Sequence, residues 1–155
     1  MTNENARNMN EILAALAEAS GVDAHELVPE ENGRVNFALD DMGVAIGMSD
    51  ADETKSDRAW VAIFVSEIPT DAETLTYLLE QNYLGASSGD GAFSIEHEIG
   101  AVVLHRIFPL PMAAEAFVEA FCLLAGAARA ARKRLSAQGA DRTLSEDCNL
   151  LFTLV

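Results

Sequence analysis

Apolar side chains recur at helical spacing near the start of the chain and again near its end. Residues 4–20 follow the i, i+3, i+4, i+7 pattern of an amphipathic helix, and Gly21 lies where a C-terminal cap belongs. Residues 112–138 carry a longer stripe of the same kind after two prolines. The two stripes contain Met9, Ile12, Leu13 and Leu16, and then Phe117, Phe121, Leu124 and Ala128. We expect one helix at each place.

A shorter helix is predicted between residues 70 and 85. Its apolar positions are Leu75, Leu78 and Leu79. Thr70 and Glu73 fit the capping box S/T-x-x-E, in which two side chains satisfy backbone amides that have no partner in the first turn. Gly85 lies where this helix should end.

Strand-like alternation fills the two regions between these helices. Residues 34–39, 42–48 and 60–65 predict three strands before the second helix, and residues 92–96 and 101–108 predict a hairpin after it. The order α-β-β-β-α-β-β-α indicates an α+β fold, with an antiparallel sheet packed by helices. We expect a single domain over residues 1–155. Residues 136–155 form an apolar tail that could add a strand, cover a groove or dock on a partner.

The net negative charge of the chain limits the classes of partner that it can bind. The chain of 155 residues carries a formal net charge of -15, and the whole excess of negative charge lies within residues 1–100, because residues 101–155 carry six basic and five acidic side chains. Such a surface repels nucleic acid and anionic lipid, and it either attracts basic partners or keeps the protein soluble. No signal peptide is visible, and acidic or basic residues interrupt the longest apolar stretch, so we expect a cytoplasmic protein without a membrane span.

No residue pattern predicts catalysis, a metal or a cofactor. His25, His97 and His105 lie in no catalytic motif, and His105, which lies within a predicted strand, is expected to have a hydrogen-bond partner rather than a metal. The run 96–98 (Glu-His-Glu) points its side chains alternately in extended backbone, so we interpret it as a solvated turn. Cys122 is expected to be a buried thiol. The basic residues near the end of the last helix either complement the helix dipole or bind a partner.

One segment resembles a known family. The run 78–85 (Leu-Leu-Glu-Gln-Asn-Tyr-Leu-Gly) resembles the LLExNxxG helix of class I type III secretion chaperones, the Tir chaperone family. A glycine-containing connection, a short strand at 92–95, a strand ending in Pro109-Leu110 and a long helix follow in the same order. The resemblance covers roughly residues 5–136. It implies an acidic cytoplasmic homodimer that binds the non-globular N-terminal segment of a secreted effector and hydrolyses no nucleotide.

Two candidate surfaces follow. The resemblance implies a dimer interface on the second helix and the strand at 92–96, and the residues that we assign to it are Tyr77, Leu78, Gln81, Tyr83, Phe93 and Ile95. A partner peptide is expected to add a strand at an open sheet edge, with residues 34–39 as the edge candidate. Its apolar contacts would be Val35, Phe37, Val44 and Ile46, which could equally belong to the core.

Two alternatives stay open on the sequence alone. A YbjN-like domain has a similar order of elements and a similar Leu-Leu-Glu-x-Asn helix, and it would be a regulatory protein unconnected with secretion. A small enzyme using the Glu96-His97 region is the other. Adjacency to secretion genes would separate the first alternative from a secretion chaperone.

Overall fold

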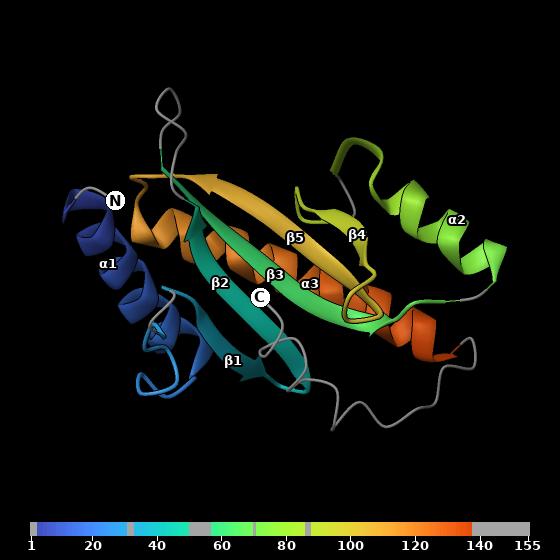
Figure 1. Cartoon of the computed structure of the whole chain (residues 1–155), viewed down its shortest axis with the longest axis horizontal. Coiled ribbons are helices and arrows are strands. Elements are labelled where there is room, and N and C mark those ends of the chain that lie inside the picture. The colour runs from blue at the N-terminus through green and yellow to red at the C-terminus, as the bar shows by residue number, and fades with distance from the viewer. Residues whose placement is uncertain (1–2, 31–32, 50–56, 70, 86–87, 138–155) are drawn as a thin grey trace. The chain divides into compact units, whose positions relative to one another are not determined.

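The computed structural model describes residues 3–30, 33–49, 57–69, 71–85 and 88–137 (Figure 1). The elements in chain order are α1 (Asn3–Ser20), β1 (Val35–Leu39), β2 (Met42–Ser49), β3 (Arg58–Glu67), α2 (Ala72–Gln81), the 3-10 turn η1 (Tyr83–Gly85), β4 (Ala92–Glu96), β5 (Ala101–Pro109) and α3 (Ala114–Ala137). The predicted α+β order is confirmed. The apolar tail expected over residues 136–155 lies, from residue 138 on, outside the described residues.

The five strands form one sheet in the order β1-β2-β3-β5-β4, so β1 and β4 are its edges (Figure 1). Each edge strand runs antiparallel to its neighbour. In the first pair Val35 lies opposite Ile46, and in the last pair Phe93 lies opposite Leu104. The prediction that residues 34–39 form an edge strand is confirmed.

The chain divides into two compact units. Unit 1 comprises Met1–Val61 and Ile107–Cys122, and unit 2 comprises Ala62–Arg106 and Leu123–Val155. The core of unit 1 contains a run of aromatic contacts in which the Phe108 and Phe117 rings lie 4.7 Å apart and those of Phe37 and Phe121 lie 6.3 Å apart. These side chains belong to the alternating faces and helical stripe that the sequence indicates, so burial of those faces organises this unit.

The start of α1 is fastened within unit 1 by asparagines. The side-chain amide of Asn8 donates to the Met112 carbonyl at 2.8 Å, and the Met112 amide donates to the Asn8 side-chain oxygen at 3.1 Å. Asn5, which is buried, donates to the carboxylate of Asp57. Since polar groups removed from water need partners, these bonds explain why a polar N-terminal helix face can be partly buried.

Gly47 of β2 lies beneath an aromatic ring. Gly43 and Gly47 are both buried, and a β-carbon built on Gly47 would fall under 3.0 Å from the indole of Trp60. The Arg34 guanidinium lies over the same indole, 5.1 Å from its centroid. The lack of a side chain at Gly47 therefore makes room for the Trp60 ring.

Helix α2 begins one residue later than its predicted capping box requires. Its N-cap is Asp71, whose carboxylate accepts a hydrogen bond from the Thr74 amide at 2.7 Å. Thr70, the cap of the predicted Thr70–Glu73 box, lies outside the described residues, and the structure gives the N-cap position to the carboxylate next in sequence, which is an equally suitable cap. Gly85, with φ of 68°, ends the following turn η1 rather than α2 itself.

Cys122 is exposed, so the predicted buried thiol was wrong. Helix α3 buries the stripe that the sequence indicates, including Phe117, Phe121 and Leu124. Position 122 lies one residue past Phe121, about 100° around the helix. An apolar stretch therefore does not bury all its members, since a helix has only one side facing the core.

Candidate functional site

The C-terminal end of α2 is tied to edge strand β4 by one side chain. The Asn82 amide nitrogen donates to the Phe93 carbonyl at 3.0 Å, and the Phe93 amide donates to the Asn82 side-chain oxygen at 2.6 Å. An asparagine satisfies both backbone groups of a strand residue because it carries a donor and an acceptor. This is the asparagine of the Leu-Leu-Glu-Gln-Asn run, so the motif has a definite structural role in joining α2 to β4.

Large apolar side chains are exposed on either side of this junction. Leu79 of α2 is 71% exposed, Tyr83 of η1 is 76% exposed and Ile95 of β4 is 39% exposed. Exposed apolar side chains that gather on adjoining elements are typical of surfaces that meet a partner. We call these three residues the α2–β4 patch.

The six residues assigned to a dimer interface divide by exposure. Tyr83 and Ile95 are exposed, Tyr77 and Gln81 are half-buried, and Leu78 and Phe93 are buried within the chain. Leu79, which the sequence places among the apolar positions of this helix, is exposed, and it is a candidate contact that sequence reasoning missed. The signal was present in the sequence, because two adjacent leucines in a helix point about 100° apart and cannot both face one core.

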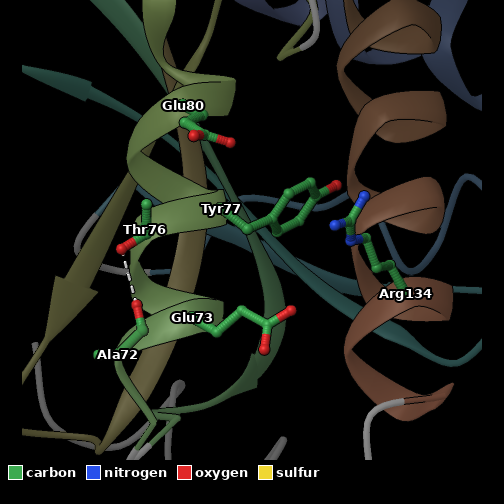
Figure 2. A pocket seen from close by; sticks show the side chains of 6 residues that line it. All are labelled: Ala72, Glu73, Thr76, Tyr77, Glu80 and Arg134. Carbon is green, nitrogen blue, oxygen red and sulfur yellow. Dashed lines mark hydrogen bonds between the residues drawn. The ribbon is translucent and has the colours of Figure 1, made fainter.

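Tyr77 faces α3 rather than open solvent. Figure 2 shows its ring reaching from α2 toward Arg134, whose guanidinium carbon lies 4.0 Å from the ring centroid. Together they line a pocket of about 370 Å³, which is bordered by Ala72, Glu73, Thr76, Tyr77, Glu80 and Arg134. One member of the basic cluster on α3 therefore has a specific partner besides any effect on the helix dipole.

The four residues assigned to peptide binding all lie in the core of unit 1. Val35 and Phe37 of β1 and Val44 and Ile46 of β2 are each 4% exposed or less. In the free chain these four side chains are therefore packed in the core, which is the alternative that the sequence left open. Their contact with a peptide stays a prediction. On the opposite face of β1, Ala38 is exposed and Asn36 is half-buried.

The residues that could have carried other chemistry lie apart from these surfaces or are already bonded. His105 Nδ1 lies 3.1 Å from the Ser94 hydroxyl, which confirms the expected hydrogen-bond partner. Glu96, His97 and Glu98 are exposed around the turn after β4. Within the described part of the chain, His, Cys, Asp and Glu side chains form no group of three that could hold a metal ion.

Among the same residues, no helix has the length and apolar character needed to cross a membrane.

Several solved structures share this fold. The ExsC–ExsE complex matches with a TM-score of 0.64 at 19% identity, covering 86% of this chain and 96% of that chain. The HopA1–SchA chaperone–effector complex matches with a TM-score of 0.60 at 14% identity, covering 83% and 97%. The Yersinia pestis type III secretion chaperone SycH, solved with a fragment of YscM2, gives 0.58 at 13% identity, covering 79% and 98%. At these identities the likeness shows the fold.

Comparison of the sequence itself gives the family. No curated protein matches the chain closely enough to count as a relative. The profile of one family, however, matches residues 11–132, which is most of the chain and includes α2, β4 and the Asn82 junction. The resemblance seen in the Leu-Leu-Glu-Gln-Asn run is thereby confirmed, and the chain belongs to the Tir chaperone protein (CesT) family.

Proposed function

We propose that this protein binds a non-globular N-terminal segment of a secreted effector in the cytoplasm and keeps it soluble and competent for type III secretion. The observation that carries the proposal is the family match over residues 11–132. The solved structures with this fold support it, since two of them hold a secretion chaperone with an effector or another protein. A chaperone of this kind needs no catalysis, because covering a partner's apolar segment is itself the function.

Among the described residues, β1 has a neighbouring strand on one side only, and its other edge supplies a binding mode for such a segment. An edge strand presents unpaired backbone amides and carbonyls, and an extended peptide can pair with them as an added strand. Backbone pairing depends little on the peptide's sequence, which suits a partner without a folded surface. The buried side chains of Val35 and Phe37 would hold β1 in place, while Asn36 and Ala38 on its outer face lie beside the added strand.

We further propose that the protein is a homodimer joined through the α2–β4 patch. A twofold interface uses the same surface on both copies. The exposed side chains of Leu79, Tyr83 and Ile95 would therefore be buried in each of the two copies. Tyr77 is engaged by Arg134 within its own chain, so we place it at the margin of the interface rather than at its centre. The Asn82 junction holds the two elements of the patch together.

Purification from the native cell tests the effector proposal. The protein would be isolated with its bound partners, and these would be identified by mass spectrometry after limited proteolysis of the complex. We expect protection of the N-terminal region of a secreted protein. Recovery of only cytoplasmic regulatory proteins would contradict the proposal and would indicate a regulatory role unconnected with secretion.

A further inference from the structure

The pocket beside α2 combines an aromatic face with carboxylates. Tyr77 forms its centre, and Glu73 and Glu80 lie four residues before and three residues after Tyr77 on the same helix face. Figure 2 shows the two glutamates on either side of the tyrosine ring along α2, with Arg134 facing the ring from α3. An aromatic face flanked by carboxylates is the chemistry that recognises an organic cation.

The chain itself shows that this ring accepts a guanidinium. Arg134 lies with its guanidinium carbon 4.0 Å from the Tyr77 ring centroid, within the range of an attractive cation–π contact. Two carboxylates and this single guanidinium line the pocket, which leaves an excess of one negative charge among its lining residues. Among the described residues, neither Glu73 nor Glu80 forms an ion pair with Arg134. The pocket therefore has the charge for a further cation, and its volume of about 370 Å³ leaves space for one side chain.

We propose that this pocket binds an arginine side chain of a polypeptide partner, and that Arg134 occupies the ring in its place when the partner is absent. The partner's guanidinium would stack on Tyr77, and the carboxylates of Glu73 and Glu80 would accept its hydrogen bonds. Arginine fits better than lysine because its planar, weakly hydrated guanidinium both stacks on a ring and donates in several directions. The inference goes beyond the proposed function, which requires only backbone pairing at β1 and apolar contact at the α2–β4 patch.

The internal arginine gives the pocket a distinctive behaviour. A ligand must displace Arg134 from the ring, so the free chain binds more weakly than the pocket alone would. Replacing Arg134 by glutamine removes this competitor and one positive charge together. Arg134→Gln should therefore tighten binding of a guanidinium ligand about two- to fivefold, the factor expected from one exposed cation–π contact. If Arg134 served only to fasten α3 to α2, the same substitution would not improve binding.

Titration with a small arginine mimic tests the proposal without any effector. N-acetylarginine methylamide would be added to the full-length protein, with the ring and amide resonances of Tyr77 followed by nuclear magnetic resonance. N-acetylcitrulline methylamide is the matched ligand, since it keeps the shape and lacks the charge. We expect saturable shifts with the arginine compound only, and stronger binding to Arg134→Gln.

Variants of the protein test which residues contact the arginine compound. Tyr77→Leu should abolish the saturable shifts of nearby amides, whereas Tyr77→Phe should keep them because the ring remains. Glu73→Gln and Glu80→Gln should each weaken binding about two- to fivefold, as expected for an exposed ion pair. Glu98→Gln, an exposed carboxylate in the turn after β4, is the matched control and should change nothing.

Two results would overturn the proposal. Equal shifts with the citrulline compound would show that charge is not recognised, and equal or weaker binding to Arg134→Gln would show that Arg134 does not compete. Neither result bears on effector binding, since the titration contains no effector. Conversely, a cell in which no effector is recovered would leave these ligand affinities as they are.

Discussion

Gly47 lies directly beneath the indole of Trp60, so the absence of a side chain there is a packing requirement. A β-carbon at this position would be under 3.0 Å from three indole atoms, and Gly47→Ala must displace the ring. We expect the free energy of unfolding to fall by about 1–3 kcal/mol, as for other overpacked sites. Trp60 is the only tryptophan, so a shift of its fluorescence emission measures the displacement directly.

The matched control for this change is Gly126→Ala in α3. A β-carbon at Gly126 meets no atom within 4 Å, and alanine is a better helix former than glycine. That variant is expected to gain up to about 1 kcal/mol in chemical denaturation with unchanged emission. If Gly47→Ala were as stable as the wild type with the same emission spectrum, Trp60 would not lie on Gly47.

Phe37 and Ala38 are adjacent in β1 but face opposite sides of the sheet. Phe37 is 4% exposed and packs near the Phe121 ring, so Phe37→Ala should lower the free energy of unfolding by about 3–5 kcal/mol. Ala38 is exposed, so Ala38→Asp should change stability by no more than about 0.5 kcal/mol while reducing capture of the partner at the β1 edge. Denaturation curves and co-purification measure the two effects separately. A stable Phe37→Ala variant that no longer captured the partner would instead support the peptide-contact assignment.

At the scale of elements, the N-cap of α2 has a defined pH dependence. The Thr74 backbone amide, with help from its side chain, holds the pKa of Asp71 below its ordinary value of 3.8. Because the folded pKa is depressed, the stabilisation from the charged cap is complete above the ordinary value and is lost as the pH falls through the folded pKa. Asp71→Asn keeps a capping side chain without this titration.

The expected result is a difference between two melting curves. The difference in thermal midpoint between the wild type and Asp71→Asn should be constant from pH 7 down to about pH 5. Below the ordinary pKa of Asp71, the midpoint of the wild type should fall relative to that of Asp71→Asn. Asp71→Ala should melt lower than both proteins at neutral pH because it has no cap. A gap that stays the same down to pH 3 would show that Asp71 is not the titrating cap.

Element order and strand faces could be predicted because they follow from local periodicity. Alternation placed β1 and β2 correctly, and the helical stripe of α3 was found with its buried face. Details that depend on competition between neighbours could not be predicted, as at Thr70 and Asp71, where both residues can cap a helix. The Tyr77–Arg134 contact joins residues far apart in the chain, so no local pattern predicts it, and the Leu-Leu-Glu-Gln-Asn run contains Asn82 without indicating its bonds to Phe93.

At the scale of the whole molecule, the α2–β4 patch predicts self-association. We expect sedimentation velocity at micromolar concentration to show a dimer, and the pair of substitutions Leu79→Glu and Tyr83→Glu to convert it to a monomer. Charged groups brought together at the twofold interface would lose their solvation without gaining a partner. Because both side chains are already exposed in the free chain, the variant should remain folded. Tyr77→Phe is the control and should stay dimeric, whereas a monomeric wild type would contradict the interface.

The domain assignment can be tested by the cooperativity of unfolding. We propose that residues 1–155 behave as one domain, since β3, β5 and α3 each contribute residues to both compact units. Unfolding of one unit would therefore break elements of the other. Trp60 fluorescence, which reports on unit 1, and the Tyr77 resonances, which report on unit 2, should give coincident denaturation curves. Two separate transitions would show that the units are independent.

Secretion of the partner tests the central claim most directly. The secreted protein that co-purifies with this chain would be measured in the culture medium and in the cells, in the wild type, in a strain lacking the chain and in the complemented strain. The account predicts that loss of the chain abolishes export of that protein and leaves it insoluble or degraded in the cell, with both effects reversed by complementation. Unchanged export and solubility in the strain lacking the chain would contradict it.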